Sequence, residues 1–207
     1  TTKELIVALE ETAARILRAG WDEGGVGAEV VAIDAATGEV LAPVDRIKAH
    51  AGEGILHQAF LTLLVEGQGE GARLLLCRRS PFKRLWGGVL ADSCAGHPLP
   101  GEDAAAATAR RINEELGITR GPDQLKHLGH VVYREDHGDG HCECEWCEVF
   151  ATHVEPGELH INQEEISEVR RVAPSELDSY LQGHPEQLAP WLREALSDQT
   201  IRAALAM

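Results

Sequence analysis

Short apolar runs recur along the chain, with turn-forming residues between them, and this pattern predicts strands. The runs occupy residues 29–34, 40–44, 60–65, 74–77, 130–133 and 143–152. The third and fourth runs are joined by the glycine-rich stretch Glu-Gly-Gln-Gly-Glu-Gly, which predicts a hairpin. The last two are separated by a polar loop over residues 134–140, which contains no expected core residue.

Helical patterns occupy three other parts of the chain. Apolar residues recur at helical spacing over residues 3–21. Residues 102–116 are alanine-rich and end at Gly117, which predicts a long helix with a glycine C-cap. The chain from Pro174 onward is mostly helical in pattern. Without a linker or repeat to divide it, residues 29–207 are predicted to form one α+β domain of mixed sheets flanked by helices, after a helical extension over residues 1–28.

Composition narrows the classes of function. The chain has 207 residues, 43% of them hydrophobic, which suits one globular domain with a sizeable core. A net charge of −15 argues against general binding to nucleic acid or to an anionic membrane. No apolar run is long enough to span a bilayer, so we expect a cytoplasmic protein, without an obligate protein partner. The odd number of cysteines suggests a reducing compartment: Cys77, Cys94, Cys142, Cys144 and Cys147.

A motif that starts at a glycine and enters the predicted helix matches the spacing of the Nudix box. Its members are Gly96, Glu102, Arg110, Ile112, Glu114, Glu115, Gly117 and Ile118. Carboxylates one helical turn apart share a face and can hold a divalent cation against a diphosphate. Arg111 stands where a Nudix hydrolase carries a glutamate, and a guanidinium there binds phosphate oxygens instead of metal. Such a charge run, taken alone, is more typical of a solvated helix face.

Histidines and glutamates elsewhere in the chain suggest a metal site. His50 and His57 precede a predicted strand, and His97 follows the run Ser-Cys-Ala-Gly. Glu143 and Glu145 alternate on a predicted strand, so both side chains point to one side. Three imidazoles and two carboxylates suit an octahedral site for Mg²⁺, Mn²⁺ or Zn²⁺ that leaves a position for water or substrate.

Taken together, these motifs resemble the type I isopentenyl-diphosphate isomerases, a branch of the Nudix fold. The resemblance runs from about Glu29 to the pair Pro190 and Trp191. It rests on four stretches: His-Ala-Gly-Glu-Gly-Ile-Leu-His, Cys-Arg-Arg-Ser-Pro-Phe-Lys, Gly-His-Pro-Leu-Pro-Gly-Glu-Asp and Glu-Cys-Glu-Trp-Cys. Its implied substrates are isopentenyl and dimethylallyl diphosphate, or a longer prenyl diphosphate.

The resemblance also implies a role for each matching residue. One divalent metal is expected on His50, His57, His97, Glu143 and Glu145. A second ion, Mg²⁺ on the substrate diphosphate, is expected on Glu115, and the diphosphate itself on Arg46, Arg79, Lys83 and Arg111. Glu145 is the expected acid, assisted by Tyr133. The Trp191 ring is expected to face the developing carbocation and to stabilise it by roughly 2 kcal/mol, although a Pro-Trp pair would equally suit the anchor of a C-terminal helix.

One position departs from the family in a way that affects the chemistry. Ala95 stands where the family carries a cysteine that works as the partner base, and alanine cannot accept a proton. Cys94 is adjacent, but neighbouring side chains on an extended segment point to opposite sides, so we interpret it as a small buried residue. Asp92 and Leu90 stand where the family tends to an amide and an aromatic residue, which suggests a reshaped pocket.

The sequence therefore leaves four functions open. The first is an isomerase whose cysteine base is missing. The second is an isomerase-like terpene cyclase that protonates the alkene of a longer prenyl diphosphate, in a pocket enlarged beside Leu90. The third is a prenyl-diphosphate binding protein without turnover, and a Nudix hydrolase is a weaker fourth because of Arg111. Cys142 and Cys144 are expected to point away from Glu143 and Glu145, as structural residues.

Overall fold

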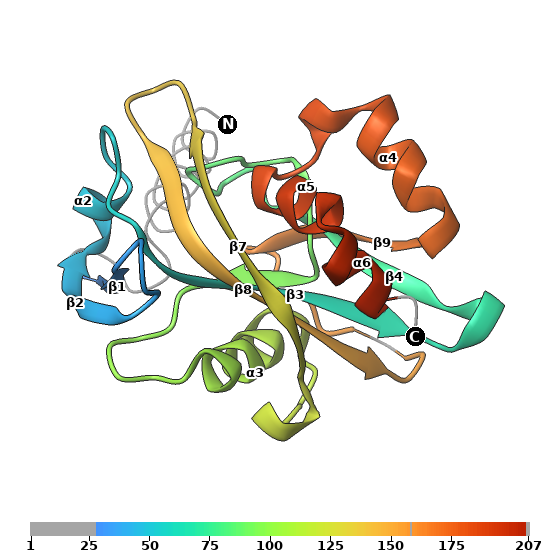
Figure 1. Ribbon diagram of the computed structural model, residues 1–207. Helices are drawn as coiled ribbons and strands as arrows, with labels where there is room; N and C mark the ends of the chain where they lie inside the picture. Colours follow the sequence, from blue (N-terminus) through green and yellow to red (C-terminus); the bar gives the residue numbers. More distant parts are fainter. Residues whose placement is uncertain (1–27, 158, 206–207) are drawn as a thin grey trace, which may run out of the picture.

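The computed structural model describes residues 28–157 and 159–205, so the helix predicted over residues 3–21 lies outside the described residues (Figure 1). The described strands are β1 (Glu29–Ile33), β2 (Val40–Asp45), β3 (His57–Glu66), β4 (Arg73–Arg79), β5 (Leu90–Ala91), β6 (Cys94–Gly96), β7 (Lys126–Asp136), β8 (Cys142–Val154) and β9 (Ile166–Val172). The described α-helices are α2 (Arg46–Ala49), α3 (Ala104–Leu116), α4 (Leu177–Gly183), α5 (Pro190–Ser197) and α6 (Gln199–Leu205). Short 3-10 turns cover η1 (Gly69–Gly71), η2 (Pro122–Gln124), η3 (Pro174–Glu176) and η4 (Pro185–Gln187).

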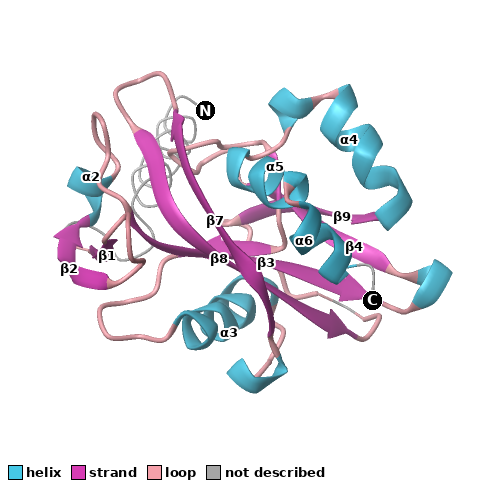
Figure 2. Ribbon diagram, viewed as in Figure 1, coloured by secondary structure: helices cyan, strands magenta, loops and turns pink. Residues whose placement is uncertain are grey.

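The strand β3 is the centre of the sheet (Figure 2). It pairs antiparallel with β1, β4 and β6, and parallel with β8 along its whole length, from His57 opposite Glu145 to Glu66 opposite Val154. The strand β7 forms an antiparallel hairpin with β8, and β9 pairs with β4. Because β3 pairs over most of its length, the residues at its two ends are held in a fixed register with β8.

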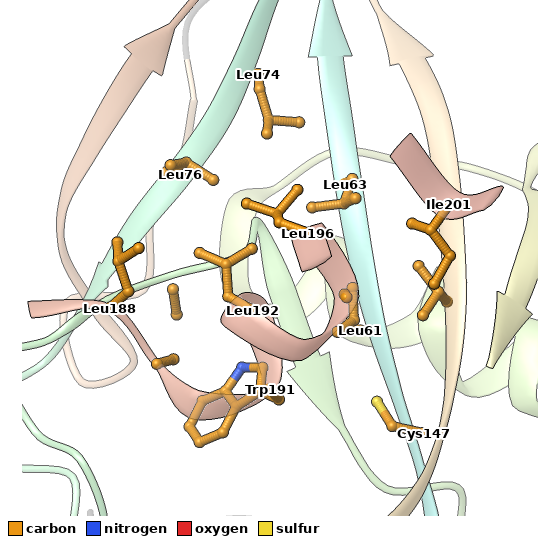
Figure 3. Close-up of a cluster of buried hydrophobic side chains, with 14 of the residues drawn as sticks. Leu61, Leu63, Leu74, Leu76, Cys147, Leu188, Trp191, Leu192, Leu196 and Ile201 are labelled. Atoms are coloured by element: carbon orange, nitrogen blue, oxygen red, sulfur yellow. The ribbon is translucent and has the colours of Figure 1, made fainter. Parts of the chain in front are cut away.

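Two hydrophobic layers cover the two faces of this sheet. Leu61 and Leu63 of β3 pack into the layer formed with α5 and α6, where Trp191 lies at one end (Figure 3). Phe60 and Leu64, the alternate residues of the same strand, pack against α3 on the opposite face. This alternation follows from the two-residue period of a strand, and it explains why β3 reads in sequence as a continuous apolar run.

The helix α3 begins and ends at residues whose chemistry favours helix termini. Asp103 is its N-cap, because its carboxylate accepts hydrogen bonds from the backbone N–H groups of Ala105 and Ala106. Gly117 ends it with φ of +69°, and a side chain at this position would meet His160. The helix therefore starts two residues later than the sequence pattern predicts, because Glu102 instead accepts hydrogen bonds from the backbone of Leu99 and from Arg110.

Most of the predicted strands are confirmed, with some differences at their ends. The hairpin of β3 and β4 is present, as is the mostly helical part from Pro174. The strand β7 extends through Asp136, so the predicted loop over residues 134–140 is wrong in its first three positions. The pattern also missed β5, β6 and β9, of which the first two are very short. Within the described residues, no helix is both long and apolar enough to cross a membrane.

Candidate active site

The five metal-ligating side chains predicted from the sequence converge. His50, His57, His97, Glu143 and Glu145 each offer a ligand atom, and these atoms all lie within 4.8 Å of one another. They come from four segments: the C-cap of α2, the start of β3, the residue after β6, and β8. The parallel pairing of β3 with β8 places His57 directly opposite Glu145, so the register of the sheet assembles the cluster.

Backbone carbonyl groups orient two of the imidazoles toward the centre of the cluster. The Nδ1 atoms of His50 and His57 lie 2.7 Å from the carbonyl oxygens of Arg46 and Ile55. A carbonyl oxygen only accepts, so these Nδ1 atoms carry the proton and the Nε2 lone pairs face the cluster. His50 Nε2 and Glu143 Oε2 lie 3.0 Å apart, buried, and neither forms a hydrogen bond within the described residues. This donor set fits a divalent cation.

Two members of the cluster, His57 and Glu143, have pKa values shifted toward the forms that bind a metal. Burial, together with His97 and His50, lowers the pKa of His57 to about 3, so this imidazole is neutral at physiological pH. Burial opposes the ionisation of Glu143, but His50 and His97 outweigh it and lower the pKa of that carboxyl group. Neutral imidazole and ionised carboxylate are the forms that bind metal ions.

Tyr133 and Glu145 form a hydrogen-bonded pair at the edge of the cluster. The Tyr133 hydroxyl donates to Glu145 Oε2, while Oε1 of the same carboxylate lies 3.0 Å from His97 Nε2. Burial and the neighbouring Glu145 raise the pKa of Tyr133 well above its usual value. Tyr133 therefore stays protonated and acts as a donor to the carboxylate.

The cluster opens into a small cavity of about 30 Å³. Its lining residues are Arg46, Phe60, Arg79, Ala95, Gly96, His97, Glu143, Glu145, Cys147 and Trp191. Ligand pockets typically measure about 300–1,000 Å³, so this cavity is much smaller than a typical ligand site. The Trp86 ring lies 5.7 Å from that of Trp191 and 4.9 Å from that of His137, and its backbone φ of +49° is unusual for a residue other than glycine.

The four basic residues predicted to bind a diphosphate divide into two groups. Arg46 and Arg79 line the cavity, and the Arg79 guanidinium carbon lies 5.1 Å from the centre of the Trp191 ring. Lys83 instead forms a buried ion pair of 2.7 Å with Glu165. Arg111 contacts Glu115 at 2.6 Å and Glu165 at 3.2 Å, also in buried ion pairs.

A second hollow of about 20 Å³ adjoins the cavity, because Arg79 and Ala95 line both. Glu115 and Glu165 also line it. Its volume is enough for about one water molecule. The predicted metal ligand Glu115 thus lies beside the basic residues, on the α3 side of the sheet.

The cysteines lie where strand alternation predicts. Cys94 is buried in the layer that packs against α3, whereas Ala95 packs against the opposite layer, with Trp191. Burial raises the pKa of the Cys94 thiol well above its usual value, so Cys94 does not replace a base at Ala95. Cys142 and Cys144 both approach Gly54, on the side of β8 away from the cluster.

The expected enlargement of the pocket beside Leu90 stays a prediction. Leu90 is buried in the core beside Leu188 and lines a separate hollow of about 270 Å³, together with Arg78 and Tyr180. It is not among the described residues that line the cavity. Leu90 pairs with Arg78 on the two-residue strand β5 and belongs to the same hydrophobic layer as Trp191.

Three residues near the site were missed or left without a role by the sequence patterns. Trp86 packs against Trp191, which lines the cavity, and Glu165 bridges two basic side chains. Neither has a local signal in the sequence. In the sequence, Asp92 stands out only as a departure from the family. Its buried carboxylate accepts a hydrogen bond of 2.7 Å from the Trp191 indole, and burial raises its pKa to about 6 even though Trp191 and Arg79 favour the charged form.

Comparison with known proteins identifies the relatives of this chain. The NUDIX domain family model matches residues 55–198. The isopentenyl-diphosphate Delta-isomerase of Rhodobacter capsulatus is 35% identical over 155 residues, which is 74% of this chain and 84% of that protein. The protein of the same name from Nocardia farcinica is 38% identical over 154 residues, 72% of this chain and 82% of that protein.

Solved structures show the same fold at lower sequence identity. A protein of Deinococcus radiodurans superposes with a TM-score of 0.60 at 19% identity, covering 84% of this chain and 98% of that one. A NUDIX hydrolase from Alicyclobacillus acidocaldarius gives a TM-score of 0.53 at 13% identity, with coverage of 70% and 90%. These two likenesses establish the fold alone.

Replacement of Asp92 tests the cost of its buried charge. The folded pKa of about 6 lies above the ordinary value of 3.8, so ionisation of Asp92 lowers stability as the pH rises through 6. We expect Asp92→Asn to increase the free energy of unfolding at pH 8 by up to roughly 3 kcal/mol, and by less at pH 5. Urea unfolding at both pH values measures the difference.

Asp139→Asn is the matched control for this measurement. His137 and His141 lower the pKa of Asp139 to about 2, so removal of its charge is expected to give no gain in stability at pH 8. A gain in the Asp92 variant that is equal at both pH values would contradict the assigned pKa.

Proposed function

The chain belongs to the Nudix family and, within it, to the type I isopentenyl-diphosphate isomerases, and on this basis we propose that it acts on isopentenyl diphosphate by metal-dependent proton transfer to give dimethylallyl diphosphate. The observation that carries the proposal is Glu145, held by Tyr133 at the edge of the His/Glu cluster, in the cavity that Trp191 also lines. All five cysteines are free thiols, which supports a cytoplasmic site of action.

The His/Glu cluster is the proposed metal site of the enzyme. His50, His57, His97, Glu143 and Glu145 would hold one divalent ion, Mn²⁺, Mg²⁺ or Zn²⁺, which would offset the buried carboxylate charges and fix the orientation of Glu145. Glu115 would hold Mg²⁺ on the substrate diphosphate. Its place beside Arg79 in the second hollow supports this role.

The proposed reaction starts from the protonated form of Glu145, which gives up that proton. The proton goes to C4 of the alkene, the electron pair of the double bond forms the new C–H bond, and a tertiary cation remains at C3. Tyr133 keeps the carboxyl group of Glu145 in position through its hydrogen bond. Trp191 lines the same cavity and offers a ring face to the cation without offering a nucleophile.

The second half of the reaction lacks its expected base. Loss of a proton from C2 would return its electron pair to form the new double bond, and Ala95 has no group that accepts this proton. Cys94 is buried on the other side of the sheet. The proposed isomerase therefore keeps the group that protonates the alkene but lacks the group that removes the proton from C2.

The diphosphate is proposed to bind at Arg79 and Arg46, with Lys83 and Arg111 completing the set. The ion pairs of Lys83 and Arg111 with Glu165 and Glu115 hold these cations in place near the second hollow. Because the cavity measures about 30 Å³, binding of the substrate requires that its lining side chains move apart.

Three alternative functions remain for the same site. A terpene cyclase that protonates a longer prenyl diphosphate is favoured by Ala95, because such an enzyme uses the cation in a different way. The small volume of the cavity favours a short substrate instead. A prenyl-diphosphate binding protein without turnover is the third candidate. A hydrolase is the weakest, since the guanidinium of Arg111 is paired with Glu115 on the Nudix helix.

Metal binding tests the first part of the proposal. We expect Mn²⁺ or Zn²⁺ to raise the melting temperature of the protein, because a ligand that binds only the folded state stabilises it. His57→Gln and Glu143→Gln should each weaken binding at least about tenfold, as judged by calorimetric titration. His153→Gln, on the exposed far part of β8, is the control and should bind as the parent does. Equal binding by all variants would exclude the cluster as the metal site.

Two adjacent arginines provide a matched test of diphosphate binding. Arg79 lines the cavity, whereas Arg78 is engaged with Glu168 at 2.8 Å. We expect Arg79→Ala to weaken the binding of a saturated prenyl diphosphate by about tenfold or more, because a charge-assisted hydrogen bond contributes roughly 1.5–3 kcal/mol. Arg78→Ala should leave the dissociation constant within about twofold. The opposite order would show that the diphosphate lies elsewhere.

Restoration of a thiol at position 95 tests the reaction itself. A positioned acid or base contributes about 10²–10⁴-fold to a rate, so we expect Ala95→Cys to interconvert isopentenyl and dimethylallyl diphosphate much faster than the parent. Ala95→Ser, of similar size and with a far weaker base, should stay slow. If Ala95→Cys remains inert while the parent converts a longer prenyl diphosphate into a cyclic product, the cyclase function is correct. If neither variant nor parent exchanges protons with any prenyl diphosphate, the protein only binds.

A further inference from the structure

Asp92 is fixed in the core by its own backbone and by that of its neighbour. Its carbonyl oxygen accepts a hydrogen bond of 3.2 Å from the N–H of Cys77, and the N–H of Ser93 donates to the carbonyl of Thr62 at 2.9 Å. Its side chain is therefore held between β4 and β3. Oδ1 accepts from Trp191 Nε1 at 2.7 Å, and Oδ2 is buried without a hydrogen bond to any described residue.

The partner of this carboxylate is the indole that lines the cavity. Trp191 lies in the first turn of α5, is 4% exposed, and ends the row of leucines that packs α5 on the sheet (Figure 3). The Arg79 guanidinium near its ring shows that this ring accepts a cation. The hydrogen bond to Asp92 links the ring to a buried negative charge on the side of its N–H group.

A buried carboxylate that accepts from an indole N–H acts on the ring in two ways. The hydrogen bond fixes the orientation of the ring, because the indole N–H bond lies in the ring plane and must point at the acceptor. The negative charge of the acceptor adds to the electrostatic attraction between the ring face and a cation, and this attraction is strong where water is excluded.

We propose that Asp92 is a positioning residue for Trp191, and that its carboxylate charge strengthens the hold of the indole on a positive charge in the cavity. The inference rests on the proposed function, because a carbocation arises only if an alkene is protonated there. Asp92 does not itself line the cavity beside the His/Glu cluster, and it would act on the cation only through Trp191.

The charge of Asp92 is set by the groups around it. Burial raises its pKa to about 6, against the effect of Trp191 and Arg79, so the carboxylate is ionised near neutral pH. The other titratable groups near it are Cys77 on β4, Cys94 on β6, Cys147 on β8, Glu115 on α3 and Glu165, which lines the same hollow. Burial raises the pKa of each of these thiols well above its ordinary value, so the thiols carry no charge in the range where Asp92 titrates.

Two diphosphates of nearly equal shape separate the charge effect from binding in general. The first diphosphate carries a tertiary ammonium group that mimics the carbocation. The second is 3-methylbutyl diphosphate, whose hydrocarbon chain is uncharged. The measured quantity is the ratio of their dissociation constants, by calorimetry at pH 8. We expect Asp92→Asn to reduce the preference for the ammonium compound by about tenfold, since cation–π contacts in dry sites reach about 2 kcal/mol, and to leave the affinity for the neutral compound within about twofold.

Controls distinguish a charge effect from a structural one. Asp178→Asn, at an exposed pair with Arg202, should leave the ratio unchanged. In a Trp191→Phe background, which lacks the N–H donor, Asp92→Asn should have no further effect on the ratio. The preference of the parent for the ammonium compound should also fall between pH 8 and pH 5, and that of Asp92→Asn should not.

The outcomes separate this inference from the proposed function. If Asp92→Asn weakens the binding of both compounds equally, the positioning role of Asp92 is wrong. The same holds if Asp92→Asn changes the ratio as much in the Trp191→Phe background as in the parent. In both cases the proposed function stands. If the parent binds neither diphosphate, the proposed function itself is wrong. A selective loss of the ammonium compound that depends on Trp191 supports the inference.

Discussion

The pairing of β3 with β8 is the constraint on which the rest of the molecule depends. It aligns His57 with Glu145 and continues in one register to Glu66. Since the side chains of β3 alternate between two buried layers, a slip of one residue would exchange Leu61 and Leu63 with Phe60 and Leu64. The packing of two hydrophobic layers therefore fixes the position of a polar cluster at the end of the strand. Stability and site geometry depend on the same set of hydrogen bonds.

Local patterns were enough to predict those parts of the fold and site that depend on nearby residues. Alternation placed Glu143 and Glu145 on one side of β8 and Cys142 and Cys144 on the other, and a C-cap glycine ended α3 at the correct residue. The contacts between distant segments were beyond this reasoning. Lys83 meets a carboxylate 82 residues away, and Asp92 meets Trp191 across 99 residues. No spacing rule connects such residues, because their proximity follows from the packing of the whole chain.

The electrostatic arrangement explains how a chain of net charge −15 can hold a basic site. Glu165 bridges Lys83 and Arg111, and Glu115 contacts Arg111 as well. Buried cations need such partners, because desolvation of an isolated charge is costly. The acidic residues on the α3 side thus keep the basic groups charged and in place, whereas Arg46 and Arg79 line the cavity itself.

The ring of Trp86 against Trp191 has a consequence for the fate of a reactive intermediate. A tertiary carbocation reacts rapidly with any water it meets, and the product is then an alcohol in place of a rearranged alkene. A cavity of about 30 Å³ leaves almost no room for bulk solvent, and exclusion of water is a general means of suppressing such side reactions. In the proposed isomerase, an apolar wall of this kind would prolong the life of a cation until it loses a proton, and the contact of Trp86 with Trp191 extends that wall.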